Sequence, residues 1–397
     1  MKLSSKMESC TLSPISKFEP LAAEAVERGI KIYHLNIGQP DVATPAVFYK
    51  ALQDYSEPIV SYSPAAGVPV LLDAIRGYYS RLGVELERTD ILPTDGGSEA
   101  IQIVCAAILD DGDELLIPEP FYTNYQTPVK LAGAKIRPVP TYVEDGYFYA
   151  DRERIESCIN EHTRAIMINS PCNPTGTVLS PEQLKMILDI VKEHDIFLIC
   201  DEVYREFSYG GEALSSALQF EGYEENVVVI DSVSKRFSAC GARIGMVISK
   251  NRYFMEQAMK WAQCRVCSPT VDMVAAAELY TLDPSYFDEV REEYIRRRDT
   301  IVEKLKNIPG VVCRYVPGGA FYVMVALPID DADAFQTWLL TDFSDNNETV
   351  VFAGGEPFYA TPGRGRNEVR MAYTINCEDI SRAMDILAIA LEKYNNR

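Results

Sequence analysis

Basic residues are scarce in this sequence of 397 residues. Lys and Arg number 38 against 58 Asp and Glu, which gives a net charge of −20 at pH 7. Such a charge repels the phosphates of nucleic acids and the headgroups of anionic lipids. We therefore expect no nucleic acid and no membrane among the partners of this protein.

Long apolar stretches are also missing. No segment reaches the roughly 18 apolar residues that a membrane-spanning helix needs, and the first part of the sequence lacks the apolar run of a signal peptide. Hydrophobic residues make up 47% and charged residues 24%, a balance that is typical of a globular chain. A cytoplasmic location is the simplest expectation.

Ligands for a metal ion are few. The chain has three His, and its ten Cys include a single C-x-x-C spacing, at Cys264 and Cys267, with no second pair or His nearby. Structural zinc sites usually draw on four such ligands. We expect no metal site, and we expect the cysteines to be reduced, mostly buried thiols.

Between about residues 90 and 250, short apolar runs alternate with helical patterns such as residues 182–194. This alternation predicts successive β-α units and an α/β fold with a mostly parallel sheet. The apolar runs predict strands at residues 90–94, 113–117, 165–169, 196–200 and 227–230. The length of the chain favours two packed lobes over one domain.

A polar cluster follows each of the five predicted strands. In chain order the clusters are TDGGSEA, PEPFYTNY, NSPCNPTG, DEVYREF and DSVSKRFSACGARIG. Ligands of open α/β sheets bind beyond the carboxyl ends of the strands. We therefore expect these clusters to meet at a single site.

The pattern changes after about residue 280. A charged helical stretch, DEVREEYIRRRDTIVEKL, leads into apolar runs at residues 321–325 and 350–352 and a final helical pattern near residues 380–394. This order predicts a second lobe of the α+β type. The N-terminal arm, through about residue 48, is too short to fold alone and is expected to join that lobe.

The fifth cluster carries the most specific chemistry. Ser232, Ser234 and Arg243 offer two hydroxyls and a guanidinium, a combination suited to a phosphate dianion. Lys235 lies between them, and desolvation at a sheet edge lowers the pKa of an amine and makes it a nucleophile toward carbonyl groups. Most lysines in such turns lie on a solvated face. The surrounding sequence therefore has to distinguish a reactive lysine from an ordinary surface lysine.

The string SVSKRFSACGARIG resembles, position by position, the lysine-attachment signature of class I and II aminotransferases. The resemblance extends from about residue 30 to 390, with the family's motifs in order. It implies pyridoxal phosphate (PLP) bound to Lys235 as a Schiff base, with Lys235 also acting as the general acid and base. It further implies fold type I: a large lobe (49–290) with a seven-stranded sheet and a small lobe (1–48 and 291–397).

Three other clusters match cofactor-binding elements of that family. Asp201 and Tyr204 of D-E-x-Y correspond to the residues that pair with the pyridine nitrogen and bind the phenolic oxygen. Asn173 of N-P-T-G corresponds to a second ligand of that oxygen, and Gly97 and Ser98 open a helix whose N–H groups face the phosphate. Taken singly, these strings also fit a helix cap, an ordinary turn and any glycine-rich helix start.

Two tyrosines extend the resemblance. Tyr122 of P-F-Y matches the aromatic residue that stacks on the PLP ring, with Phe121 as the alternative in register and a core tyrosine as the ordinary explanation. Tyr62 matches a tyrosine that reaches the phosphate of a neighbouring subunit. This correspondence implies a homodimer with shared active sites.

The substrate side of the resemblance involves both ends of the chain. Arg370 matches the arginine that holds the substrate α-carboxylate, which Gly38 and Asn173 also approach. One departure stands close by: V-F-A-G-G-E replaces the family's more usual V-x-x-P-G before the loop that closes over the site. That departure puts the loop of the small lobe in doubt, but not the chemistry.

The resemblance leaves the amino acid and 2-oxo acid substrates open. Aspartate with 2-oxoglutarate is our first expectation, followed by aromatic amino acids or alanine as donors. Some related aspartate aminotransferases have a lysine where this chain has Ser98, so a side-chain carboxylate needs another cation. Arg265 is the candidate, and a surface arginine at a helix end is the alternative. A PLP-dependent β C–S lyase would use the same cofactor residues.

Overall fold

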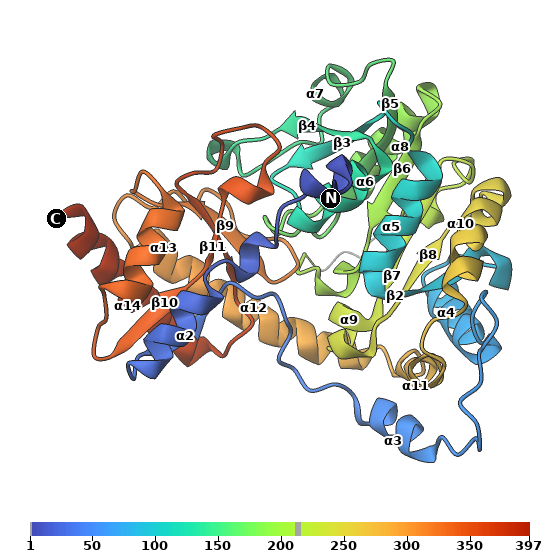
Figure 1. Cartoon of the computed structure of the whole chain (residues 1–397), viewed down its shortest axis with the longest axis horizontal. Helices are drawn as coiled ribbons and strands as arrows, with labels where there is room; N and C mark the ends of the chain where they lie inside the picture. The colour runs from blue at the N-terminus through green and yellow to red at the C-terminus, as the bar shows by residue number, and fades with distance from the viewer. Residues whose placement is uncertain (1, 211–215) are drawn as a thin grey trace.

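The structure of the protein is a computed structural model that describes residues 2–210 and 216–397. Two groups of elements lie side by side (Figure 1): a large twisted sheet with its helices, and a smaller group that contains α2 and α14 from opposite ends of the chain.

The bounds of the elements are as follows. The α-helices are α1 Ser5–Glu8, α2 Glu19–Glu27, α3 Ala46–Asp54, α4 Pro69–Arg81, α5 Gly96–Ile108, α6 Gln126–Ala132, α7 Arg152–Glu156, α8 Pro181–Glu193, α9 Val233–Arg236, α10 Arg252–Arg265, α11 Thr270–Leu279, α12 Ser285–Lys306, α13 Ala332–Thr341 and α14 Cys377–Asn395. The strands are β1 Lys31–His34, β2 Ile91–Asp95, β3 Glu114–Glu119, β4 Lys135–Pro140, β5 Thr163–Asn169, β6 Phe197–Asp201, β7 Val227–Ser232, β8 Ile244–Ile248, β9 Tyr322–Ala326, β10 Glu348–Val351, β11 Ala353–Gly354 and β12 Glu368–Ala372. The 3-10 helices are η1 Pro14–Ser16, η2 Arg88–Asp90, η3 Thr123–Tyr125, η4 Val143–Asp145, η5 Arg205–Phe207, η6 Ala217–Gln219, η7 Cys240–Ala242 and η8 Glu356–Phe358.

The large sheet has seven strands in the order β2-β8-β7-β6-β5-β3-β4. β8 runs antiparallel to both neighbours, and the other pairs are parallel. The α/β fold with a mostly parallel seven-stranded sheet is therefore confirmed, and β2, β3, β5, β6 and β7 match the predicted strands to within two residues at each end. The pattern did not single out β4 and β8: β4 is an edge strand with two prolines, and β8 begins inside the turn-rich fifth cluster.

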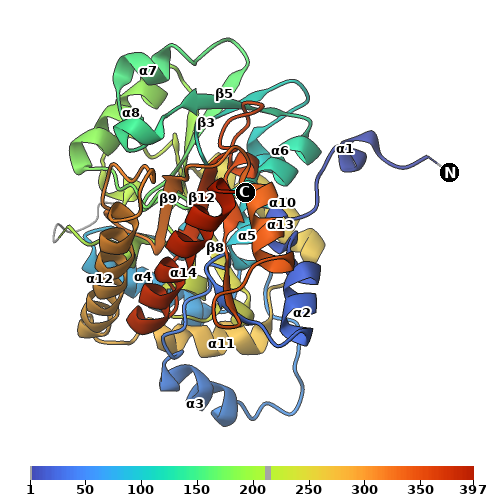
Figure 2. The same cartoon turned by 90° about the vertical axis from the view of Figure 1, so that its left-hand side faces the viewer.

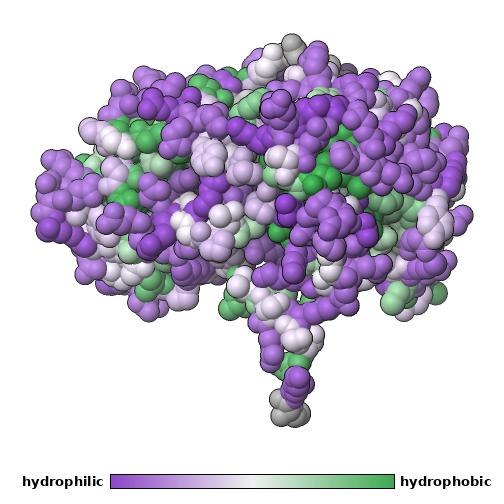
Figure 3. Space-filling view, turned by 90° about the horizontal axis from the view of Figure 1, so that it is seen from above, coloured by the Kyte–Doolittle hydropathy of each residue, from purple (hydrophilic) through white to green (hydrophobic). Residues whose placement is uncertain are grey.

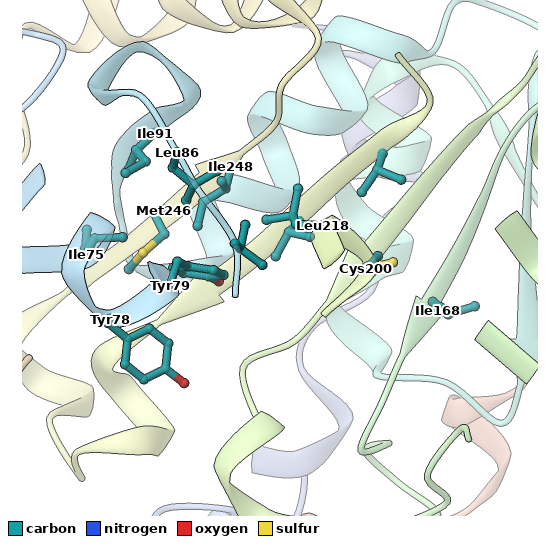
Figure 4. Packing of buried hydrophobic residues seen from close by; sticks show 14 of the residues in the cluster. Ile75, Tyr78, Tyr79, Leu86, Ile91, Ile168, Cys200, Leu218, Met246 and Ile248 are labelled. Carbon is teal, nitrogen blue, oxygen red and sulfur yellow. The ribbon is translucent and has the colours of Figure 1, made fainter. Parts of the chain in front are cut away.

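Helices cover both faces of this sheet. α5, α6 and α10 pack on one face, and α4, α8 and α11 pack on the other. Successive residues of a buried strand serve opposite faces, as Met167 and Ile168 of β5 do. Figure 4 shows part of the second face, where Ile168 lies on β5, Cys200 lies on β6 and Tyr79 packs from α4. With both faces covered, the strand ends are left to form a site.

The smaller lobe combines two small sheets with helices. β9, β12 and β11 form a three-stranded antiparallel sheet, and β1 pairs in parallel with β10. The α+β character predicted for the C-terminal part is present, and the N-terminal arm supplies β1 to it. α2, α13 and α14 surround these strands (Figures 1 and 2).

The division into lobes at residues 49 and 290 stays a proposal. α12 runs without interruption from Ser285 to Lys306, across the second boundary. At the other end, α1 lies near α6 of the large lobe (Figure 2), where Lys6 Nζ and Asp111 Oδ1 are 2.6 Å apart.

Two surface features bear on the sequence expectations. None of the helices in the described part of the chain is both long and apolar enough to cross a membrane, and Figure 3 shows a mostly hydrophilic face with hydrophobic residues scattered over it.

All ten cysteines are free thiols, but the expectation that most are buried is wrong. Cys105, Cys172 and Cys200 are buried in the large lobe, whereas Cys264 is exposed at the end of α10.

Candidate active site

The polar clusters meet at the carboxyl edge of the large sheet, around a cavity of about 220 Å³. Residues from all five clusters line it, together with residues from the N-terminal arm and the smaller lobe. The predicted residues on its wall are Gly38, Gly97, Ser98, Tyr122, Asn173, Asp201, Tyr204, Ser232, Ser234, Lys235, Arg243 and Arg370. The convergence expected from the strand order is confirmed.

Lys235 projects into this cavity from the short helix α9. Ser232, the last residue of β7, caps α9 because its hydroxyl accepts a 3.0 Å hydrogen bond from the Ser234 N–H. The Lys235 amine donates to the carbonyl of Gly38 over 2.8 Å. Burial lowers the pKa of Lys235, and the nearby Arg370 and Arg243 lower it further. The neutral amine, which is the nucleophilic form, is therefore more accessible than for an exposed lysine.

One end of the cavity carries groups that can bind an anion. α5 begins there at Gly96, so its first N–H groups point toward the cavity. Arg243 lies beside that helix start with a left-handed backbone (φ 53°). A Cβ on Gly245 would lie 2.4 Å from the backbone of Gly96, so only glycine allows this approach of β8 to α5. Hydroxyls, N–H groups and a guanidinium together suit a phosphate.

Asp201 forms a different kind of wall. It is the last residue of β6, and it accepts hydrogen bonds from the Tyr125 hydroxyl (2.6 Å) and the Val203 N–H (3.3 Å). Burial raises the pKa of Asp201 to about 6, although both hydrogen bonds oppose the rise. A buried carboxylate that is held by neutral donors is suited to a cationic N–H group of a ligand.

Aromatic and amide side chains line the space between Asp201 and Arg370. The hydroxyls of Tyr204 and Tyr322 lie 2.9 Å apart. Asn173 is held in place because its N–H donates to the side-chain oxygen of Asn169 over 2.7 Å. Tyr122 lines the cavity, whereas Phe121 is buried in the core of the sheet. The structure therefore favours Tyr122 over its neighbour as the aromatic residue of the site.

Arg370 lies on β12 and is fully buried. Its Nη1 donates to the Asn173 side-chain oxygen over 3.0 Å, and its Nη2 donates to the carbonyl of Asn36. The guanidinium carbon lies 4.7 Å from the ring centre of Tyr322 and 5.1 Å from that of Phe358. Its Nε has no hydrogen-bond partner within residues 2–210 and 216–397. This planar, incompletely paired group can bind a carboxylate through two contacts.

Two residues named from the sequence lie away from the cavity wall. The Tyr62 side chain is 84% exposed, so it does not serve the site of its own chain. Arg265 also does not line the cavity: its Nη1 lies 2.7 Å from Glu99 Oε2 and donates to the Ser268 hydroxyl over 2.6 Å. Its charge is already neutralised within the chain.

Sequence reasoning missed several residues of the site. Tyr125 lies three residues after Tyr122 in the second cluster, and this spacing on the turn η3 could have indicated a second inward tyrosine. Tyr322 belongs to an apolar run that predicts only a strand. Ile15 and Cys240 also line the cavity, and neither carries a local signal of function.

A buried charge network lies behind Lys235. Asp231 accepts two hydrogen bonds from Arg236 (2.7 and 2.9 Å), one from Arg205 (3.2 Å) and one from the hydroxyl of Tyr79 (2.9 Å). All of these groups are buried, and the two guanidinium groups compensate the charge of the carboxylate. The network fixes α9, and with it Lys235, relative to β7, η5 and α4.

Comparison with known proteins agrees with this geometry. Residues 30–387 match the family model described as aminotransferase class I and II. The chain is 30% identical to an aspartate aminotransferase of Bacillus subtilis over 100% of both chains, and 30% identical to aromatic-amino-acid aminotransferase 2 of Thermococcus litoralis over 99% of both. The structure of an alanine aminotransferase from Pyrococcus furiosus matches with a TM-score of 0.90 at 29% identity, covering 99% of this chain and 100% of that one. The chain therefore belongs to the class I and II aminotransferase family.

Proposed function

We propose that this protein is a PLP-dependent aminotransferase that moves the amino group of an L-amino acid, aspartate first, to a 2-oxo acid, 2-oxoglutarate first. The observation that carries the proposal is the shared cavity of about 220 Å³, in which Lys235, Asp201, Arg370 and the anion-binding start of α5 face one another.

The residues present fit PLP by charge and by donor type. The start of α5 with Ser232, Ser234 and Arg243 offers donors for the phosphate. Asp201 offers an anion for the pyridine N–H, and its own hydrogen-bond partners, the Tyr125 hydroxyl and the Val203 N–H, are neutral. Tyr204 and Asn173 offer hydrogen bonds to the phenolic oxygen. Tyr122 supplies an aromatic face.

When bound, PLP would supply an aldehyde carbon and an electron-withdrawing ring. The protein would supply positions and protons. Lys235 Nζ would hold the cofactor covalently until the amine of the substrate replaces it, and the freed Lys235 amine would serve as the base and acid that moves a proton between the substrate Cα and the cofactor carbon. Arg370 would hold the α-carboxylate, and Asp201 would keep the ring nitrogen protonated. A second 2-oxo acid would complete a ping-pong cycle.

The choice of aspartate rests on relatives rather than on a side-chain contact. Curated relatives include aspartate aminotransferases of several organisms, and aromatic-amino-acid and alanine aminotransferases are also similar. Lys235, Arg243 and Arg370 line the cavity, and each already has a role in the proposal. Aspartate is therefore the first donor to test, with aromatic amino acids and alanine next.

The test is a spectral titration of the purified protein with PLP. Single L-amino acids are added, and the visible absorbance of the lysine-bound cofactor is followed. Loss of this band with aspartate and its return with 2-oxoglutarate would support the proposed reaction. A band that forms but never changes, or release of pyruvate and ammonia in place of transfer, would contradict it.

We also infer that the active form is a homodimer in which Tyr62 contributes to the partner's site. Tyr62 lies in an exposed apolar segment with Ile59 and Val60, whose side chains are 72% and 66% exposed. Co-refolding Lys235→Ala chains with Tyr62→Ala chains tests this inference. Mixed dimers would contain one site with both residues intact, so activity well above that of either variant alone is expected. No gain on mixing would contradict shared sites.

A further inference from the structure

Glu119 is a fully buried carboxylate just outside the cavity described above. It is the last residue of β3, and both of its oxygens accept hydrogen bonds from the loop between β11 and β12. Oε2 accepts from the N–H groups of Ala360 and Thr361, each over 3.1 Å. Oε1 accepts from the Thr361 hydroxyl over 2.8 Å and from Arg364 Nη1 over 3.2 Å. Four donors from one loop thus converge on a single side chain.

The same loop is tied to the segment that follows β3. The Phe121 N–H donates to the carbonyl of Phe358 over 2.9 Å, and the Gln126 side chain donates to the carbonyl of Pro357 over 3.0 Å. The Arg364 guanidinium also lies over the rings of Tyr142 and Tyr359, at 4.5 and 5.1 Å. Residues 357–364 are therefore held against the large lobe rather than left as a free loop.

This anchored loop supplies one of the two aromatic walls of Arg370. Phe358 is completely buried, and its ring centre lies 5.1 Å from the guanidinium carbon, while that of Tyr322 lies 4.7 Å from it. The guanidinium plane is set by the hydrogen bonds of Nη1 and Nη2 to Asn173 and Asn36 together with the packing of these two rings, since Nε has no partner in the described chain.

We infer that Glu119 is a positioning residue for substrate recognition: it anchors the loop 357–364, and Phe358 of that loop orients Arg370 toward the substrate α-carboxylate. The inference rests on the role proposed for Arg370. The anchored loop directly follows the segment V-F-A-G-G-E, residues 351–356.

Glu119→Gln tests the inference with little change in shape. All four groups around Glu119 donate hydrogen bonds, whereas a glutamine side chain accepts through one oxygen and presents an NH₂ group through the other atom. Thr361 can rotate its hydroxyl to accept, but Arg364 Nη1 cannot accept and loses this hydrogen bond, while Nη2 keeps its bond to the Thr141 carbonyl. The loop is therefore expected to loosen while the fold is retained.

The readout is binding of 2-oxoglutarate to the PLP-loaded protein, measured by calorimetry, together with the dissociation constant of PLP. Glu119→Gln is expected to weaken 2-oxoglutarate about tenfold, in the same direction as Arg370→Lys, and to change PLP affinity less than about twofold. The matched control is Glu348→Gln, which removes a carboxylate that pairs with Arg382 and Tyr33 in the smaller lobe, on β10. It should lower stability without weakening 2-oxoglutarate.

Equal 2-oxoglutarate affinities for Glu119→Gln and the wild type would overturn the inference, as would equal losses for the Glu119 and Glu348 variants. Thr361→Val, which removes one of the four donors from the loop side, serves the same test if Glu119→Gln fails to fold. A wild-type protein that binds 2-oxoglutarate but converts no amino acid would refute the proposed reaction and leave this test intact. A wild type that binds no 2-oxoglutarate would refute the role of Arg370 and this inference with it.

Discussion

The hydroxyl of Tyr125 donates to Asp201 Oδ2 over 2.6 Å, and both side chains are buried. A hydrogen bond to the ionised form lowers the pKa of a carboxyl group, so Tyr125 opposes the effect of burial on Asp201. Tyr125→Phe is therefore expected to raise the pKa of Asp201. The anion that would meet the pyridine N–H then forms only at higher pH.

For Tyr125→Phe we predict about tenfold lower turnover, because a buried hydrogen bond to a charged group is lost. The acid limb of PLP affinity should move to higher pH, and PLP affinity measured across pH 5–8 checks this shift. Tyr147→Phe is the control, since it removes a buried tyrosine hydroxyl that donates to Glu368 over 3.0 Å, away from the cavity wall. Identical pH profiles for the two variants would show that Tyr125 does not tune Asp201.

Asp201 should make the PLP-free protein less stable as the pH rises. Its pKa is 3.8 in the unfolded chain and about 6 in the folded one, so between these values the native state binds more protons than the unfolded state. Stability therefore falls through this window and stays lower above it. Each unit of difference between the two pKa values corresponds to about 1.4 kcal/mol, so ionised Asp201 lowers the free energy of unfolding at pH 7 by about 3 kcal/mol.

Asp201→Asn removes this titration. Between pH 4 and pH 7 the free energy of unfolding of the PLP-free variant is therefore expected to rise relative to that of the wild type, by up to about 3 kcal/mol. Urea unfolding at several pH values measures this difference. With saturating PLP the wild type should become the more stable of the two proteins, because it binds the ring N–H more strongly and is stabilised by mass action. A difference between the two proteins that is independent of pH would contradict the raised pKa.

The general position of the site could be predicted because parallel strands end at one edge and each of the five strands is followed by a polar cluster. Spacing along the chain could not reveal contacts made by distant segments. Glu119 looks like the end of a strand in the sequence, and its three partner residues lie more than 240 residues later. Arg265 meets Glu99 across 166 residues, so the sequence could not show that its charge is already paired.

Arg265 is expected to act on stability rather than on substrate choice. It and Glu99 are both mostly buried, so Arg265→Ala leaves Glu99 without its cation and should lower the free energy of unfolding by about 3 kcal/mol. The ratio of kcat/KM for aspartate to that for alanine should change less than about twofold, because Arg265 does not line the cavity.

Glu99→Gln is the matched control for that prediction, since it releases Arg265 from its partner while keeping the guanidinium. If Arg265 bound the side-chain carboxylate of the substrate, Glu99→Gln would raise the ratio of kcat/KM for aspartate to that for alanine above the wild-type ratio. Arg265→Ala would then lower kcat/KM for aspartate selectively. Either outcome would assign Arg265 to the substrate.

Lys235 is the residue proposed to carry both the cofactor and the proton. Borohydride reduction of the PLP-loaded protein, followed by peptide mass spectrometry, locates the lysine to which PLP is bonded. We predict a single modified residue, Lys235, and no adduct and no steady-state transfer of amino groups in Lys235→Ala. An adduct on another lysine, or steady-state transamination that persists in Lys235→Ala, would contradict this role of Lys235.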